Sequence, residues 1–327
     1  MSKIRQRLLL MPIDCDESDF AAIERHLFLG NKELAHNPYH LKKLDITLVI
    51  GVYPKSQIDL IVQLMPSQTR FRLVDAKDIP HEDLISRFDS IIEDMIEEIE
   101  DKEGNVFVFC SAGFSRSVTV VAAYLMKKLR ITANEAIERI RTVRPKINPN
   151  PGFIGQLALY EDMDYEFDVR HPEYRVFALI CLKKQIWTQD YWEESEIGEQ
   201  YRHFCIPLSD YQSKLKSNDK NSRISLTNIH YNCVNCCQSL FNELNVLKPT
   251  LDFNVMETND CPNLFIEPQE WMKPMICIHK KGRLLCPKCD TLLGSFKWKS
   301  YKCQCLKHNQ LHDSLVFKII TQSVIAQ

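Results

Sequence analysis

The sequence has no long hydrophobic run and no clear excess of charge of one sign. Its longest apolar runs, such as Val118–Met126, are far shorter than the roughly 20 residues of a membrane-spanning helix, so we expect no membrane partner. The formal net charge is −2, which does not indicate a nucleic-acid partner, and we expect no sequence-specific binding of DNA. The basic N-terminus runs through a short apolar stretch into acidic residues, a pattern that predicts no signal peptide.

The 13 cysteines are unevenly distributed, because nine of them lie between Cys233 and Cys305. Without a signal peptide we expect a reducing compartment, in which cysteines act as metal ligands or nucleophiles rather than as disulfides. The sequence therefore predicts a protein of the cytosol or the nucleus with a cysteine-rich C-terminal part.

Residues 20–163 have the pattern of a compact α/β domain, with a central sheet flanked by helices. Short runs rich in β-branched and aromatic residues predict buried strands at 45–52, 70–76 and 105–110. Between the last two runs, apolar residues recur at helical spacing over 84–99, which predicts an amphipathic helix.

The remaining chain forms two further regions. Residues 164–227 indicate a linker region of uncertain structure, in which Arg175–Leu182 fits either a strand or a helix and 209–223 is polar. From 228 to 320, paired cysteines and short strand-like runs predict a β-rich, zinc-binding domain.

Cys110 and Arg116 lie in the stretch VFVFCSAGFSRSVTVVAAYLMKK (106–128), where a strand-like run enters a loop and a helix-like run leaves it. Cysteine attacks as a thiolate, which a helix N-terminus and nearby cations stabilise. Backbone N–H groups ahead of a helix can bind a tetrahedral dianion, Gly113 lets the backbone turn, and a guanidinium matches two phosphate oxygens. The pattern predicts attack of Cys110 on phosphorus and hydrolysis of a phosphocysteine, with an inert core cysteine as the alternative. The predicted phosphate-binding loop is Ser111, Ala112, Gly113, Phe114, Ser115 and Arg116.

Two further groups complete this chemistry. Ser117 can donate a hydrogen bond to the departing thiolate in the second step. The leaving group needs a proton from a carboxylic acid on a separate loop. VDAKDIPHEDL (74–84) offers Asp75, Asp78 and Asp83, and spacing alone does not choose among them.

CSAGFSRS (110–117) resembles the signature loop of the cysteine-dependent protein tyrosine phosphatases, in their compact dual-specificity branch. Further matches are HLFLGNKELAHN (26–37), DIPHEDLISRF (78–88) and RPKINPNPGFIGQL (144–157), and together they cover about residues 20–163. The resemblance implies a shallow pocket that accepts phosphoserine and phosphothreonine as well as phosphotyrosine. It also implies the site roles: Asp78 as general acid, Cys110 as nucleophile, Arg116 as phosphate clamp and Ser117 as helper hydroxyl.

One residue departs from the family pattern, which places a histidine immediately before the nucleophile. Here that residue is Phe109. The family's histidine orders the loop and helps to hold the cysteine as a thiolate. We therefore expect a weakened but active hydrolase, with its optimum at a higher pH than in histidine-containing relatives.

Cys233-x2-Cys236 and Cys286-x2-Cys289 are two pairs that can each bind one side of a zinc ion, and four thiolates complete a tetrahedron. Buried, unpaired thiols are the alternative. A tentative second structural zinc ion would take Cys261, Cys303 and Cys305 with one of His279, His308 and His312. We expect no cofactor for catalysis itself.

Within the tail, CPNLFIEPQEWM (261–272) and LLCPKCDTLLGSFKW (284–298) resemble dual-specificity phosphatase 12 and its fungal counterparts. That resemblance implies zinc binding, a role in assembly of the large ribosomal subunit on pre-60S particles, and a location in nucleus and cytoplasm. Residues 306–308 depart from the family pattern. The leading hypothesis is a phosphatase of phosphoproteins. The alternatives are a weakly active or inactive fold that serves as a ribosome-assembly factor, and a phosphatase of RNA 5′ ends.

Overall fold

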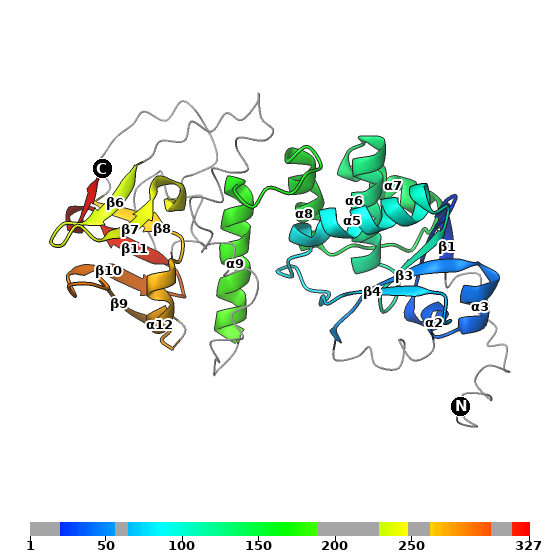
Figure 1. Ribbon diagram of the computed structural model, residues 1–327, viewed down its shortest axis with the longest axis horizontal. Helices are drawn as coiled ribbons and strands as arrows, with labels where there is room; N and C mark the ends of the chain where they lie inside the picture. The colour runs from blue at the N-terminus through cyan, green and yellow to red at the C-terminus, as the bar shows by residue number, and fades with distance from the viewer. Residues whose placement is uncertain (1–19, 56–64, 189–228, 248–261, 277, 302–315) are drawn as a thin grey trace, which may run out of the picture. The chain divides into compact units, whose positions relative to one another are not determined.

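The computed structural model describes residues 20–55, 65–188, 229–247, 262–276, 278–301 and 316–327 (Figure 1). The chain divides into two compact units, Met1–Asp168 and Val169–Gln327. No helix in the described ranges is both long enough and apolar enough to span a membrane.

The first unit is built on a five-stranded sheet in the order β1-β2-β5-β3-β4. Its strands are β1 (Phe20–Glu24), β2 (Leu27–Gly30), β3 (Ile46–Val52), β4 (Arg70–Val74) and β5 (Asn105–Phe109). β1 is antiparallel to β2, and the other neighbours are parallel. All three predicted strands are present, and β5, which leads to Cys110, lies in the middle of the sheet.

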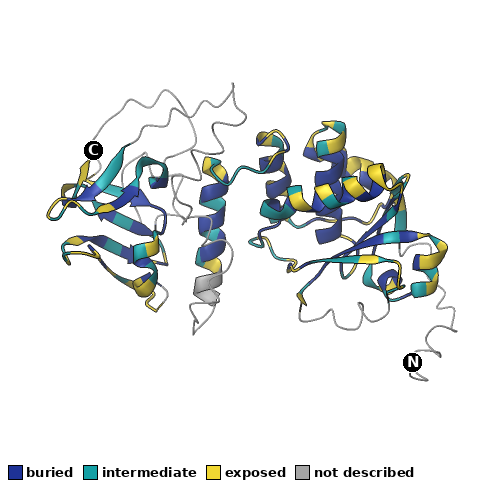
Figure 2. Cartoon of the chain, in the orientation of Figure 1, coloured by how far each residue is buried: buried dark blue, intermediate teal, exposed yellow. Residues whose placement is uncertain are grey.

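Helices cover both faces of this sheet (Figure 1). They are α2 (Lys32–Ala35), α3 (Pro38–Lys43), the 3₁₀ turn η3 (Ile85–Arg87), α5 (Phe88–Ile96), the π turn η4 (Glu97–Asp101), α6 (Arg116–Leu129), α7 (Ala133–Val143) and α8 (Pro151–Asp162). Every residue of α6 from Arg116 to Met126 is buried (Figure 2). The helix that follows the phosphate-binding loop is therefore held on all sides, which fixes the direction of its N-terminus.

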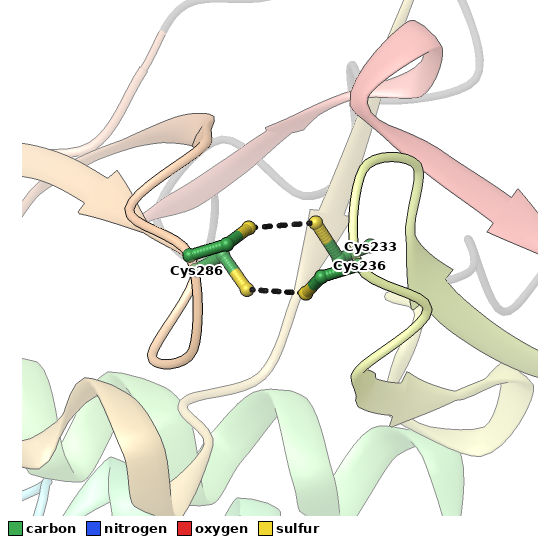
Figure 3. A group of neighbouring side chains, drawn as sticks. Cys233, Cys236 and Cys286 are labelled. Atoms are coloured by element: carbon green, nitrogen blue, oxygen red, sulfur yellow. Dashed lines mark hydrogen bonds between the residues drawn. The ribbon is translucent and has the colours of Figure 1, made fainter.

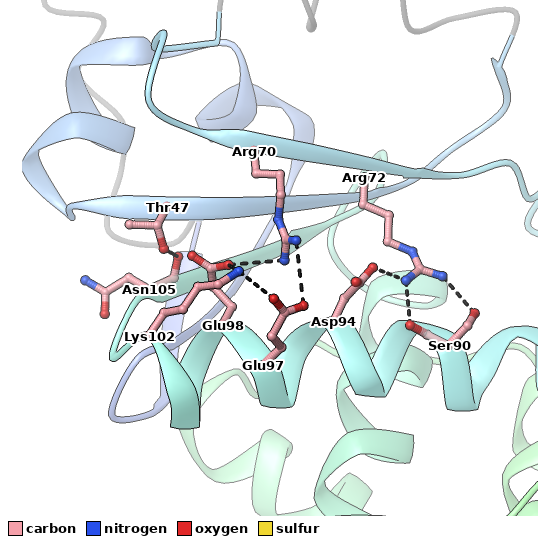
Figure 4. Close-up of polar contacts among 9 residues, drawn as sticks. All are labelled: Thr47, Arg70, Arg72, Ser90, Asp94, Glu97, Glu98, Lys102 and Asn105. Carbon is pink, nitrogen blue, oxygen red and sulfur yellow. Dashed lines mark hydrogen bonds and ion pairs between the residues drawn. The ribbon is translucent and has the colours of Figure 1, made fainter.

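Strand β4 is tied to α5 and η4 by two arginines (Figure 4). Arg72 forms an ion pair with Asp94 and donates to Ser90 Oγ at 2.8 Å, and Arg70 Nη2 donates to Glu98 Oε2 at 3.1 Å. Because β4 leads to the loop that carries Asp78, these contacts anchor the start of that loop.

The second unit contains one long helix and two antiparallel sheets. The helix is α9 (Pro172–Thr188), and the strands are β6 (His230–Cys233), β7 (Ser239–Asn242), β8 (Asn263–Ile266), β9 (Lys281–Leu285), β10 (Leu292–Lys297), β11 (Phe317–Ile320) and β12 (Val324–Ala326). Short helical pieces are η6 (Glu243–Asn245), η7 (Glu270–Met272), α12 (Lys273–Ile276) and η9 (Thr321–Ser323). One sheet has the order β8-β11-β10-β9 and the other β12-β6-β7.

Helix α9 settles the open question about Arg175–Leu182, which is helical. Arg175 forms a buried ion pair with Glu267, and Asn245 Nδ2 donates to Glu267 Oε2 at 3.3 Å. A buried carboxylate needs such partners, because an unpaired charge in the interior is strongly unfavourable. Residues 169–188 of the predicted linker region thus belong structurally to the unit that carries the paired cysteines, whereas 164–168 belong to the first unit.

Candidate active site and metal centre

Cys110 lies at the end of β5, directly before the predicted phosphate-binding loop. It is 1% exposed. Ser117, in the first turn of α6, is fully buried, and its Oγ donates a hydrogen bond to Cys110 Sγ at 3.1 Å. The hydroxyl is thus in place to stabilise negative charge on this sulfur.

The Arg116 guanidinium donates hydrogen bonds to two different loops, the phosphate-binding loop and the loop that carries Asp78. Its Nη2 donates to Ser111 Oγ at 2.8 Å, and its Nη1 donates to the carbonyl oxygen of Ala76 at 3.2 Å. The buried Nε has no hydrogen-bond acceptor within the described part of the chain, and its nearest carboxylate oxygen is Asp78 Oδ2 at 3.5 Å. A buried N–H without an acceptor fits an arginine whose acceptor is a bound oxyanion.

Asp78 is the acid of its loop that contacts the phosphate-binding loop. Its Oδ1 accepts hydrogen bonds from Ser115 Oγ and from Asn150 Nδ2, both at 2.8 Å. Asp75, in contrast, accepts the backbone N–H of Lys55 at 2.8 Å. Asp83 accepts the N–H of Ser86 at 3.2 Å, ahead of η3. Among the three acids that spacing left open, the geometry therefore favours Asp78 as the general acid.

The shape of the loop is enforced by contacts to its carbonyl groups. Gly113 has a φ of 69°, and a Cβ atom there would lie 2.5 Å from the carbonyl oxygen of Gly30, so only glycine fits. Arg144 Nε donates to the Gly113 carbonyl at 3.1 Å, and its Nη2 lies 3.5 Å from the Ala112 carbonyl oxygen. Within the described residues, the N–H groups of 111–115 have no acceptor, so they remain available to an anion.

Phe109 is a core residue. Its ring is fully buried in an apolar cluster with Leu34 and Ala35, stacks on Phe107 at 5.8 Å between ring centroids, and lies 6.4 Å from the ring of Tyr53. The residue before Cys110 is thus a side chain that packs with α2 and cannot hydrogen bond to the loop.

In the second unit, Cys233, Cys236, Cys286 and Cys289 form a group whose four Sγ atoms all lie within 4.8 Å of one another. The sulfurs of Cys233 and Cys289, and those of Cys236 and Cys286, are 3.6 Å apart (Figure 3). Four thiolates at about 2.3 Å from a zinc ion would be roughly 3.8 Å apart, so the group fits a tetrahedral metal site. The structure thus brings together the four cysteines of the two predicted pairs in a group that could hold a metal ion.

The ionisation of these thiols also fits a cation. The hydroxyl and then the backbone N–H of Thr291 lower the pKa of Cys289 to about 6. The backbone N–H of Gln238 lowers the pKa of Cys236, but burial and the three neighbouring sulfurs outweigh it and raise that pKa to about 12. Four negative charges cannot gather here without a cation among them, and a bound metal ion supplies one.

The structure does not test the prediction of a second zinc site. Cys261, Cys303, Cys305, His308 and His312 lie outside the described residues, and His279 is exposed.

Comparison with known proteins identifies the family. The family model for "Dual specificity phosphatase, catalytic domain" matches residues 27–163. "Dual specificity protein phosphatase 12" of Mus musculus is 31% identical over 295 residues, which are 85% of this chain and 81% of the mouse protein. The chain belongs to this family of dual-specificity protein phosphatases.

Two fungal proteins extend the comparison. "Tyrosine-protein phosphatase yvh1" of Schizosaccharomyces pombe is 30% identical over 208 residues, 63% of this chain and 57% of that protein. The crystal structure of the Yvh1 phosphatase domain from Chaetomium thermophilum has 26% identity and covers 46% of this chain and 99% of its own, with a TM-score of 0.40.

Two contributors to this dual-specificity phosphatase site escaped the sequence reasoning. Asn150 caps α8 through the N–H of Phe153 at 3.0 Å and also holds Asp78. The sequence feature that could have predicted this cap is Asn150-Pro151, an N-cap residue followed by proline at the first helical position. Arg144 begins the family-like stretch 144–157, but that match gave it no role, because its contacts with the loop carbonyls depend on tertiary packing.

Proposed function

We propose that the protein hydrolyses phosphotyrosine, phosphoserine and phosphothreonine on proteins through a phosphocysteine at Cys110. The observation that carries this proposal is the convergence on one loop of Cys110 Sγ, the Ser117 hydroxyl, the unsatisfied Arg116 Nε and the Asp78 carboxyl group. Family membership supports the same chemistry.

In the first step, the Cys110 thiolate forms a bond to phosphorus while the bond from phosphorus to the substrate oxygen breaks. The loop N–H groups and the Arg116 guanidinium bind the phosphoryl oxygens. Asp78 gives a proton to the departing oxygen. Because both hydrogen bonds to Asp78 go to Oδ1, the transferred proton belongs on Oδ2, the oxygen that lies nearer Arg116.

In the second step, water attacks phosphorus and the bond between phosphorus and sulfur breaks. Asp78, now ionised, takes a proton from the water. The departing thiolate accepts the hydrogen bond of Ser117, which lowers the barrier of this step. Inorganic phosphate and the starting enzyme are the products.

The test is phosphate release from a phosphotyrosine peptide and from a phosphothreonine peptide of the same sequence. We expect turnover of both peptides and its loss in Cys110→Ser, with a phosphorylated cysteine trapped by rapid acid quench in the wild type. Failure to trap phosphorus on Cys110 during turnover would contradict the mechanism. Faster phosphate release from triphosphate-ended RNA than from either peptide would instead favour an RNA 5′-phosphatase.

We further propose that the four-cysteine group binds structural zinc and that its unit acts in assembly of the large ribosomal subunit, in nucleus and cytoplasm. The support is the likeness to the mouse relative, which extends well beyond the catalytic domain. In cells that lack the protein, Cys110→Ser should restore pre-60S maturation, and a chain ending at Asp168 should fail. Rescue by the shortened chain would refute this role for the second unit.

A further inference from the structure

The outward face of the β9–β10 hairpin carries exposed cations. Along β9, alternate residues Lys281, Arg283 and Leu285 are exposed, as the two-residue period of a strand dictates. On β10, the exposed residues are Leu292 and Lys297. The two leucines are partners at the end of the hairpin next to the cysteine pair, and the cations occupy the rest of this face.

These cations are placed against one another rather than beside acids. Lys281 and Lys297 are direct cross-strand partners, and Arg283 is opposite Ser295. Like charges directly opposite each other destabilise a sheet. None of the three cations forms an ion pair with any residue in the described ranges. Two further lysines are exposed: Lys288 in the turn between β9 and β10, and Lys299 just after β10.

Protection of a sheet edge does not account for this arrangement. Charged side chains on an edge strand prevent pairing with another molecule, and β9 is the edge of its sheet. That reason applies to Lys281 and Arg283. It does not apply to Lys297, because β10 is paired on both sides, with β9 and with β11.

Neutralisation of the thiolates does not account for it either. Lys288 lies between Cys286 and Cys289 and can offset their negative charge. Lys281 precedes Cys286 by five residues, which in a strand is roughly 17 Å. At that separation, exposed charges are largely screened at physiological salt.

The composition of the face indicates the class of partner. Protein–protein interfaces are depleted of lysine in their centre and are anchored by exposed aromatic residues, whereas nucleic-acid interfaces are strongly positive. Of the aromatic residues near this hairpin, Phe296 and Trp298 are buried in the core, and Tyr301 is half-buried with its hydroxyl donating to Ser295 Oγ at 2.8 Å. Without an exposed ring to stack on the bases of a single strand, the face fits the phosphates, which a duplex presents on its outside.

We propose that this face, defined by Lys281, Arg283 and Lys297, binds the phosphate backbone of a nucleic-acid duplex without reading its sequence. Cations on alternate residues of β9 are about 6.6 Å apart and form a row with Lys297 beside it. The near-zero net charge of the chain does not oppose this, because the local charge sets the attraction.

The test uses the full-length, zinc-loaded protein and a fluorescent RNA duplex of about 20 base pairs, with anisotropy measured between about 50 and 200 mM salt. The triple variant Lys281→Ser, Arg283→Ser, Lys297→Ser should lose at least about tenfold in affinity at 100 mM salt. Its plot of log affinity against log salt should be less steep by about three, one for each lost phosphate contact.

A matched control removes the same charge from exposed positions of the first unit: Lys42→Ser, Lys43→Ser, Lys146→Ser. It should bind as the wild type does. Both triple variants should keep their zinc content and their turnover of p-nitrophenyl phosphate, which shows that each unit is folded. An equal loss in the control, or an unchanged salt slope in the hairpin variant, would overturn the proposal. Equal or tighter binding of a single strand, or of a polyglutamate of matched charge, would also overturn it.

Discussion

At the scale of single residues, the proposed chemistry depends on which oxygen of the Asp78 carboxyl group already accepts hydrogen bonds. Ser115 and Asn150 both donate to Oδ1. Ser115 Oγ in turn accepts the backbone N–H of Asn150 at 3.1 Å. Asp78 is therefore held by a small network that joins the phosphate-binding loop to the start of α8, and its other oxygen is left for the proton transfer that we propose.

Asn150→Asp tests this network, because aspartate keeps the helix cap but cannot donate to Asp78. We expect kcat to fall about 10- to 100-fold for a phosphoserine peptide, whose leaving group needs the proton. The fall should be much smaller for p-nitrophenyl phosphate, whose leaving group departs without an acid. Thr132→Ala removes a cap from α7 far from Asp78 and serves as the control. Equal losses on both substrates would refute a positioning role.

Phe109→His places a polar ring in an apolar cluster. We expect the free energy of unfolding to fall by about 2 kcal/mol, because a buried imidazole without partners loses its hydration. Chemical denaturation of wild type and variant measures this. Phe107→Leu, in the same cluster, controls for loss of ring stacking alone. A variant as stable as the wild type would show that the imidazole finds a hydrogen-bond partner.

The wild type should also reach its highest turnover at a higher pH than histidine-containing relatives, which a pH–rate profile checks.

At the scale of elements, the phosphate-binding loop is shaped from outside itself. Gly113 approaches the end of β2, and Arg144, just beyond the end of α7, binds two loop carbonyls. The carbonyl groups of Ala112 and Gly113 thus accept hydrogen bonds from Arg144, and the loop N–H groups remain available to bind an anion.

Gly113→Ala should abolish turnover while the fold survives. Alanine at a φ of 69° costs about 1 kcal/mol, and its Cβ would press against the Gly30 carbonyl, so the loop must open. Vanadate binding by calorimetry should disappear together with activity. Gly155→Ala is the control, because a Cβ there meets nothing within 4 Å. Normal vanadate affinity in Gly113→Ala would contradict this account.

The sequence could predict the strands, the loop and Cys110 because they follow from local pattern. Arg116 and Gly113 are within six residues of the nucleophile. Arg144 and Asn150 could not be assigned in the same way, because their contacts join segments more than 30 residues apart. Likewise, α9 was ambiguous because its apolar residues do not form one clear face, and its partner Glu267 lies 92 residues away.

At the scale of the whole molecule, the proposed catalytic residues and the four cysteines belong to different compact units. The second unit has two small sheets joined through its cysteine pairs: Cys233 ends β6, and Cys286 follows β9. A metal ion would therefore link the two sheets.

Removal of the metal should unfold the second unit and spare catalysis. After treatment with a strong chelator, we expect exchange protection of backbone amides in β6 and β9 to vanish, because the binding energy of structural zinc is largely folding energy. Turnover of p-nitrophenyl phosphate should change less than about twofold. Hydrogen exchange and kinetics on one sample measure both. Protection that persists without metal would show that the sheets hold together unaided.

The packing of Phe109 constrains a second position. A side chain at Gly51 would meet the Phe109 ring at 2.9 Å, so the two positions share one volume on neighbouring strands. Substitutions at either place are consequently not independent: enlargement of residue 51 demands a smaller or differently oriented residue 109. In members of the family, substitutions at positions 51 and 109 should therefore be correlated. An engineer who restores a histidine before the nucleophile should vary residue 51 in the same library.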